Sequence, residues 1–256
     1  MVKSSLFLIA IFTVSLQTLF AQQDEKQVVN QAIQWFSVNS NIALTKRFSL
    51  YIEGQFRQVG TFDPMQYQLR TAVDVKLNDH FSIVPVGYVY TWNYQYGKQP
   101  AAYKNNEHRF FQQVVYKHSL GITKIDHRIR IEERFVQHHH TNTDGEIVDD
   151  GYDVELYRLR YRLMARVPLN AKKIEPGTWF LSAYDEVFVS WGSPVTYHKP
   201  DQNRLFAGIG FQFDKSTTLQ GGLLYHMLIK GNGTMQENNV GPQVMLTYNL
   251  DCSKAH

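Results

Sequence analysis

Apolar and polar residues alternate along much of the chain, and the clearest example is the segment KIDHRIRIEERFV, Lys124–Val136. Every second residue from Lys124 to Arg134 is charged, whereas the intervening positions are mostly apolar. A period of two predicts a β-strand with one polar and one apolar face. The pattern fits a soluble sheet, with water on the polar side, or a transmembrane barrel strand, with lipid on the apolar side.

The same alternation recurs in segments of about ten to thirteen residues, which is longer than the usual strand of five or six in globular sheets and matches a tilted transmembrane strand. The aromatic-rich segment 81–93 is apolar on both sides, so its facing is ambiguous. Eleven strands are expected, near residues 34–44, 48–57, 67–77, 81–93, 107–118, 124–136, 157–167, 178–190, 202–213, 219–229 and 240–250.

The connections between these strands alternate between short and long. Short ones lie near residues 45, 79, 121, 170 and 215, and long ones near 62, 100, 145, 196 and 235. Outer-membrane barrels have short periplasmic turns and long external loops. We therefore expect Thr143–Asp149 outside the cell and Asn78–His80 in the periplasm.

The number of strands follows from a parity argument. Single-chain bacterial barrels have an even strand count, so a further first strand is expected before Gln34, and Asp24–Val29 is the only segment available for it. The sequence thus predicts an all-β protein, a single transmembrane antiparallel up-and-down β-barrel of about 12 strands, with 10 as the alternative.

The N-terminus has the features of a secretory signal. Lys3 supplies the positive charge, Leu6–Leu16 is apolar, and Leu19-Phe20-Ala21 is the expected cleavage site before Gln22. Residues 1–21 are therefore expected to be the signal peptide and 22–256 the barrel, located in the cell outer membrane. The single cysteine, Cys252, excludes an internal disulfide and a thiolate metal cluster.

Several stretches resemble one protein family. They are QNRLFAGIGFQF, the pair HRIRIEERF and YRLRYRL, the segment WFSVNSNIALTKRFSLYIEGQFR, and YDEVF. Together they resemble the DUF2490 family of Gram-negative outer-membrane β-barrel proteins, over about residues 30–250. The resemblance implies a barrel in the outer membrane and supplies no catalytic residues.

Charged side chains gather on the faces expected to line the lumen. A polar interior is the rule in these barrels, so we expect a salt-bridged, structural lumen. The alternative is a narrow channel that favours small acidic solutes, because arginine suits anionic groups. The expected lumen charge cluster comprises Arg128, Arg130, Glu132, Arg134, Arg158, Arg160, Arg162, Glu53, Glu107, Glu186 and Arg204. Asp74 and Asp126 could share this lumen.

Other chemistry has weaker support. The run His138–His140 lies in an expected external loop, 138–153, and consecutive side chains of an extended chain do not face one site, so no metal site is expected. A lipid-modifying enzyme is a second alternative, but no GxSxG motif occurs, and His226 is expected to point inward and His127 towards lipid. We expect no enzyme activity, no catalytic residues, no cofactor and no nucleic-acid partner. The expected partners are outer-membrane lipid and small anionic solutes, with the protein a monomer.

Four glycines fall within two adjacent strands: Gly208, Gly210, Gly221 and Gly222. Glycine inside a strand marks a bend or a close approach, and curvature of the wall is the expected reason.

Overall fold

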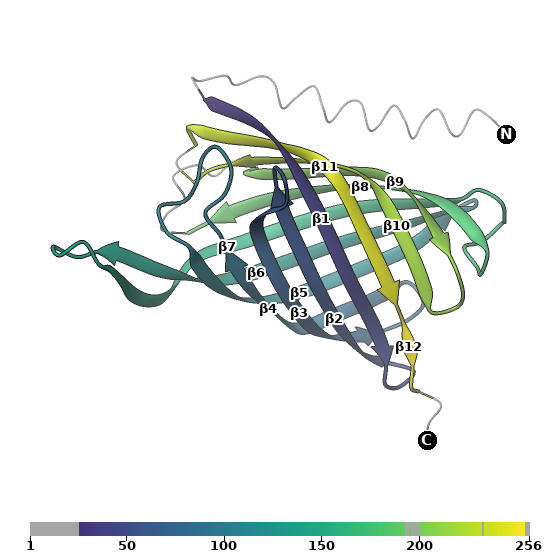
Figure 1. Cartoon of the computed structure of the whole chain (residues 1–256). Coiled ribbons are helices and arrows are strands. Elements are labelled where there is room, and N and C mark those ends of the chain that lie inside the picture. Colours follow the sequence, from purple (N-terminus) through teal and green to yellow (C-terminus); the bar gives the residue numbers. More distant parts are fainter. Residues whose placement is uncertain (1–25, 193–194, 196–199, 232, 254–256) are drawn as a thin grey trace.

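The computed structural model describes residues 26–192, 195, 200–231 and 233–253, and over these residues the chain is an all-β barrel (Figure 1). No helix in this part of the chain is long and apolar enough to cross a membrane. The expected signal peptide, residues 1–21, lies outside the described residues. The strands are β1 Gln27–Ala43, β2 Phe48–Val59, β3 Asp63–Lys76, β4 Phe81–Asn93, β5 Asn105–Leu120, β6 Thr123–Thr141, β7 Ile147–Pro168, β8 Thr178–Trp191, β9 Gln202–Gln212, β10 Thr217–Ile229, β11 Met235–Tyr248 and β12 Leu250–Asp251.

The wall closes by pairing the first long strand with the last. Consecutive strands from β1 to β11 pair antiparallel, and β1 then pairs with β11 in parallel. The two-residue β12 follows β11 and pairs with the end of β1. The predicted barrel and a strand count near twelve are therefore confirmed, with eleven long strands in the described wall.

The expected additional strand over Asp24–Val29 was wrong for the part described, because Gln27–Val29 belongs to β1. The even-count rule led to it. An odd number of up-and-down strands leaves the first and last running in the same direction, so only a parallel pair can close the ring. The alternation pattern, which indicated eleven strands, was the better guide.

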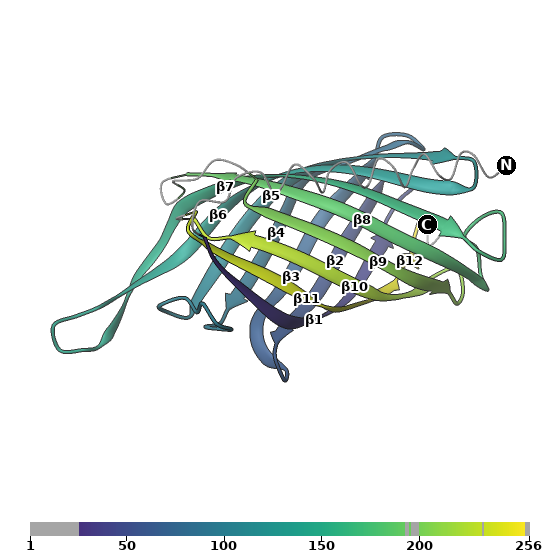
Figure 2. The same ribbon diagram turned by 90° about the horizontal axis from the view of Figure 1, so that it is seen from above.

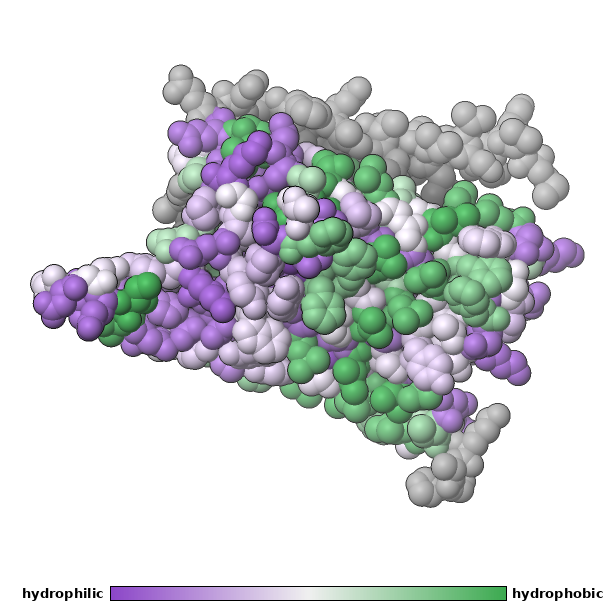
Figure 3. All heavy atoms as spheres, viewed as in Figure 1, coloured by the Kyte–Doolittle hydropathy of each residue, from purple (hydrophilic) through white to green (hydrophobic). Residues whose placement is uncertain are grey.

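The predicted facing holds along the wall. On β6, Ile129 and Ile131 are each 50% exposed on the outside, whereas Arg130 is 4% exposed inside. Apolar side chains cover much of the visible outer wall, and polar ones predominate on the β6–β7 hairpin that projects beyond it (Figure 3). An apolar outside around a charged inside is the arrangement of a barrel in lipid.

The ambiguous strand, β4, contains an irregularity that explains the ambiguity. Its pairing with β5 shifts between Val84 and Gly87. Val84 is buried before the shift, and Gly87, Val89 and Thr91 are buried after it. A bulge inserts one residue and so exchanges the two faces along the strand, which makes both sides apolar in sequence.

The two ends of the barrel differ (Figure 2). We call them the turn end, with connections at residues 44–47, 77–80, 121–122, 169–177 and 213–216, and the loop end, with connections at 60–62, 94–104, 142–146, 192–201 and 230–234. The alternation is less strict than predicted, because 60–62 is short and 169–177 is not. The expected loop 138–153 is largely a β-hairpin, because β6 and β7 continue pairing to Thr141 and Ile147. Its polar composition did not prevent strand pairing.

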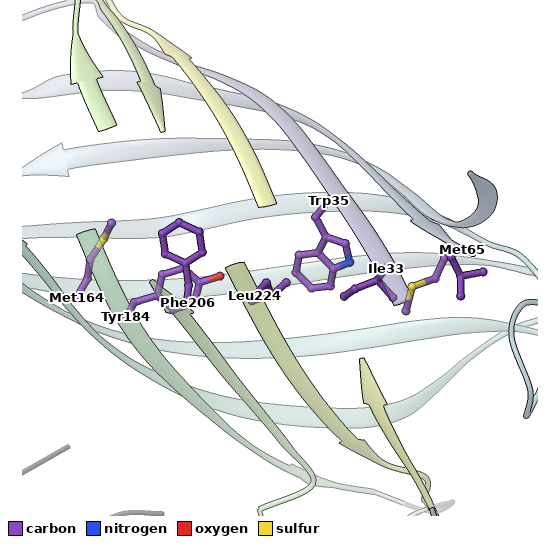
Figure 4. Packing of buried hydrophobic residues seen from close by; sticks show 8 residues of the cluster. Ile33, Trp35, Met65, Met164, Tyr184, Phe206 and Leu224 are labelled. Carbon is purple, nitrogen blue, oxygen red and sulfur yellow. The ribbon is translucent and has the colours of Figure 1, made fainter. Parts of the chain in front are cut away.

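Apolar side chains also occupy part of the interior. Ile33 and Trp35 of β1, Phe206 of β9 and Leu224 of β10 form a buried cluster (Figure 4). Tyr184 of β8 stacks on Phe206, with ring centroids 5.2 Å apart. These residues give one side of the lumen an apolar lining.

Candidate functional site

The lumen has two unlike sides. We call the lumen faces of β5–β8 the charged sector and those of β1 and β9–β11 the seam sector, because the parallel β1–β11 pair lies in it. Inward positions two residues apart place a ladder of arginine and glutamate on the charged sector. The glutamates Glu107 and Glu132 are 0% exposed there, so they are enclosed by the arginines around them.

Each buried glutamate of the charged sector is shared among several arginines. Glu132 Oε1 accepts a hydrogen bond from Arg160 Nη1 at 2.5 Å, and its carboxylate lies 3.5 Å from Arg109 and 3.6 Å from Arg130. Buried charges require paired and hydrogen-bonded partners. One carboxylate shared among three arginines neutralises only part of their charge. The charged sector therefore keeps a net positive charge.

The other glutamates follow the same rule. Glu107 accepts two hydrogen bonds from Arg134, at 2.5 and 2.6 Å, and one from Arg109 at 2.9 Å. Glu186 accepts hydrogen bonds from Arg128 at 2.5 Å and from Arg160 at 2.8 Å. The network therefore joins β5, β6, β7 and β8 into one unit.

A layer of arginines and aromatic rings crosses the lumen between its two ends. The guanidinium of Arg57 lies 4.1 Å from the ring of Trp35, and that of Arg204 lies 4.9 Å from the same ring and 4.4 Å from Phe188. Arg160 lies 4.6 Å from Phe188. An aromatic face attracts a cation placed over it, most strongly where water is excluded. This stack, here called the arginine layer, runs from β2 to β7, two strands that are not neighbours in the wall.

The arginine layer separates two cavities. The outer vestibule, of about 310 Å³, opens towards the loop end and is lined by residues including Arg109, Arg134 and Arg158. The inner vestibule, of about 470 Å³, is lined by residues including Arg128 and Arg162. The only arginines that line both cavities, among the residues described, are Arg57, Arg160 and Arg204.

Two arginines of the outer vestibule are held by neutral acceptors. Arg57 donates to the side-chain oxygens of Gln55 and Gln68, at 2.9 and 3.0 Å, and to that of Gln66. Arg158 donates from Nε to Ser190 Oγ at 3.0 Å. Within the described ranges neither guanidinium forms an ion pair with a carboxylate, so these hydrogen bonds fix their positions without neutralising their charge.

The loop between β4 and β5 contributes Tyr96 to the lining of the outer vestibule. The segment 94–104, which joins β4 to β5, reaches the seam sector, where Tyr96 Oη donates to Glu237 Oε2 at 3.0 Å. The backbone N–H of Lys98 donates to Gln31 Oε1 at 3.2 Å, and Gln99 Nε2 donates to the Gln27 carbonyl at 3.2 Å. The loop is therefore tied to both strands of the parallel pair.

Comparison with known proteins identifies the family. The family described as "Protein of unknown function (DUF2490)" matches residues 33–237, which is more than half of the chain. The chain belongs to the DUF2490 family. This confirms the resemblance drawn from its strands.

Among solved structures, this DUF2490 barrel is similar to the NanC porin, with 11% identity over 83% of this chain and 91% of that one, at a TM-score of 0.47. It is also similar to the β domain of the Bordetella autotransporter BrkA, with 10% identity over 80% and 84% of the chains, at a TM-score of 0.44. A search of the curated proteins finds no match.

All eleven residues of the expected lumen cluster lie on the inner face of the DUF2490 barrel, and most are in the ion-pair network. Glu53 pairs with Arg70. Arg130 donates to Gln113 Oε1 at 2.7 Å, and Arg162 lies 5.9 Å from the Tyr184 ring. Asp126 pairs with Arg166 at 2.5 Å. Asp74 accepts a hydrogen bond from Ser82 at 3.3 Å.

Three buried arginines were absent from the expected cluster: Arg57, Arg70 and Arg109. Each lies on the polar face of an alternating segment, so the period of two could have included them. Their burial depends on how β2, β3 and β5 curve around the ring, and alternation within one strand does not report this.

The histidines have local partners. His226 is inward and 3% exposed, and its ring lies 5.5 Å from that of Trp35. His127 lies on the outer face, 2.8 Å from Tyr161 Oη. His140 lies 2.8 Å from Asp150, and no cluster of three or more potential metal ligands occurs among the described residues.

The strand glycines mark close approaches. A Cβ at Gly210 would overlap the Phe180 ring, and one at Gly208 or Gly222 would overlap the backbone of the neighbouring strand. Gly221 has only ordinary contacts at 3.9 Å. Close contact is therefore the reason for three of the four glycines, where wall curvature had been expected.

Proposed function

We propose that this protein is a monomeric outer-membrane barrel whose lumen is closed by the arginine layer, so that its role is structural. The observation that carries the proposal is that both vestibules end at Arg57, Arg160 and Arg204, each less than 10% exposed and packed on Trp35 or Phe188. The apolar outer face supports lipid as the surrounding solvent. The proposal assigns no catalytic activity, and His127, on the outer face, is already bonded to Tyr161.

Conductance in planar bilayers tests the closed lumen. The wild-type barrel should conduct weakly, whereas the double variant Trp35→Ala, Phe188→Ala removes both rings of the arginine layer and should raise the conductance. Trp179→Ala, on the outer face, is the matched control because Trp179 is 47% exposed. A large conductance in the wild-type protein contradicts the closed lumen.

The second candidate is a narrow channel that favours small anions. The observation that favours it is the state of Arg57 and Arg158. Neutral groups hold both guanidinium groups in position, and no described carboxylate forms an ion pair with either. Unneutralised cations that line a pore favour anions. A wild-type conductance with strong anion selectivity, measured from the reversal potential in a salt gradient, would select this candidate over the structural one.

Orientation in the membrane is tested with epitope tags on intact cells. The β6–β7 hairpin tip at 142–146 should be accessible outside, and the turn at 77–80 should be accessible only after the outer membrane is permeabilised. The longer connections at the loop end support this orientation. Labelling at residue 79 but not at residue 145 on intact cells would show that the barrel has the opposite orientation.

A further inference from the structure

We propose that the outer vestibule is a binding site for a small solute that carries two negative charges on phosphate or carboxylate groups. This goes beyond the structural role above and rests on it only for the position of the vestibule on the outer side of the membrane. The solute would enter from the loop end and stop at the arginine layer.

The charge balance of the outer vestibule sets the charge of the ligand. Seven cations line it: Arg57, Arg109, Arg134, Arg158, Arg160, Arg204 and Lys230. The described acids that line it or pair with these cations are Asp201, Glu107, Glu132, Glu186 and Glu237. Seven cations against five acids leave a surplus of two, and Glu132 and Glu186 are further shared with Arg130 and Arg128.

The glutamates stand behind the arginines. Glu107, Glu132 and Glu237 are 0% exposed. A solute in the vestibule therefore meets guanidinium groups first, and the carboxylates hold those groups in place from behind. Donors fixed before the ligand arrives lose little conformational entropy on binding.

Arg158 is the residue best placed to bind the anion. It is 6% exposed, and its Nε is held by Ser190 Oγ, which in turn donates to Asp201 Oδ2 at 2.7 Å. Arg57 provides the second unneutralised charge in the same cavity. The planar guanidinium binds carboxylate and phosphate oxygens in pairs, which lysine cannot do.

The size and position of the cavity limit the ligand further. A volume of about 310 Å³ is at the lower end for ligand pockets, which span roughly 300–1,000 Å³. The cavity lies inside the wall, whereas lipid headgroups lie outside it. A water-borne solute therefore fits better than a membrane lipid.

The test is calorimetric titration of the full mature barrel in detergent micelles without phospholipid. Inorganic phosphate and succinate are the charged probes, and glucose is the uncharged one. Both anions should bind one site and glucose should not. Arg158→Gln should weaken binding of both anions by about tenfold or more, the loss of a charge-assisted pair of hydrogen bonds.

Arg162→Gln is the matched control. Arg162 lies on the same strand and the same face, and like Arg158 it forms no ion pair among the described residues, but it lines the inner vestibule. This variant should bind phosphate within twofold of the wild type. Arg158→Lys, which keeps the charge without the fork, should bind more tightly than Arg158→Gln and more weakly than the wild type. Heat-modifiable gel migration checks that each variant is folded.

The outcomes separate this proposal from the structural one. The binding site is overturned if neither phosphate nor succinate binds the wild type saturably, or if Arg158→Gln and Arg162→Gln lose equal affinity. In either case the closed lumen is still decided by the conductance test. Binding by the wild type that depends on added phospholipid assigns the anion to a lipid headgroup and also overturns the proposal. A high wild-type conductance together with intact anion binding would contradict the closed lumen and support the binding site.

Discussion

The charged sector and the seam sector enclose the same lumen by different means. In the charged sector, long side chains meet: Arg160 of β7 spans from Glu132 of β6 to Glu186 of β8. In the seam sector, small residues meet: Gly208 of β9 pairs with Gly222 of β10, and Gly241 of β11 lies against the backbone of Ile33.

The difference between the two sectors shows how one barrel wall can close tightly on one side and carry buried charges on the other. The seam sector places backbone against backbone, so its tolerance for added atoms is small. The charged sector fills its space with long arginine side chains held by glutamates, so it tolerates a changed side chain but not a lost counter-charge. Substitutions in the two sectors should therefore fail for different reasons.

The largest expected effect is at the seam. Gly241→Ala places a Cβ onto the Ile33 carbonyl oxygen, and a backbone atom of the closing pair cannot move aside without opening the pair. We expect most of the protein to fail to fold, a loss above about 4 kcal/mol, seen as a missing heat-modifiable band. Gly54→Ala is the control, because nothing lies within 4 Å of its added Cβ. Normal folding of both variants would show that the seam is loose.

The next effect is in the charged sector. Glu186→Gln removes the carboxylate shared by Arg128, Arg160 and Arg204, so the free energy of unfolding should fall by about 3–5 kcal/mol, the cost of leaving a buried charge unpaired. Chemical denaturation in lipid vesicles measures the change. Glu133→Gln is the control, since Glu133 lies on the outer face between Phe110 and Tyr157. If the two variants were equally stable, the network would contribute little.

A third comparison uses neighbouring residues on opposite faces of the charged sector. Ile129→Arg puts a charge on the lipid-facing side and should cost about 2–4 kcal/mol. Arg130→Gln should assemble more normally, because Arg130 lies 3.6 Å from a Glu132 that other arginines also neutralise. The folded fraction after assembly into vesicles measures both. Equal assembly of the two variants would contradict the facing of β6.

These comparisons also show what the sequence could predict. Alternation gave the barrel, the eleven long strands and the inward side of β6 and β7, because each of these follows from a local period of two. The parallel β1–β11 pair followed from the strand count, but a rule about even counts obscured it. The bulge between Val84 and Gly87 on β4 hid its facing, since one inserted residue exchanges the two faces.

The site was less accessible to prediction. The sequence located arginines and glutamates on inner faces, but which glutamate neutralises which arginine depends on register between strands. The arginine layer combines Arg57 of β2, Trp35 of β1 and Phe188 of β8, and no spacing along the chain places these at one height. Trp35 lies in an expected strand, but nothing in the sequence around it indicates that arginines pack on its ring.

The smallest effect compares the turn of the seam sector with a turn beyond it. In the β9–β10 turn, hydrogen bonds from the Ser216 and Thr217 N–H groups to Asp214 Oδ1 hold the pKa of Asp214 below its ordinary value. In the β3–β4 turn, the exposed Lys76 lowers the pKa of Asp79. A depressed carboxyl pKa contributes stability above the ordinary pKa of about 3.9, and this is lost as the pH falls through the folded-state pKa.

We therefore expect Asp214→Ala to lower the denaturation midpoint slightly at neutral pH, and the difference from the wild type to vanish in acid once Asp214 is protonated in both states. Asp79→Ala should shift the midpoint less, because an exposed ion pair is screened by salt and contributes little. Denaturation curves of both variants at neutral and acidic pH, in low and high salt, separate the two causes. A loss in Asp214→Ala that persists in acid would mean that the turn depends on the packing of this side chain, and that the carboxylate hydrogen bonds do not set the strength of the β9–β10 connection.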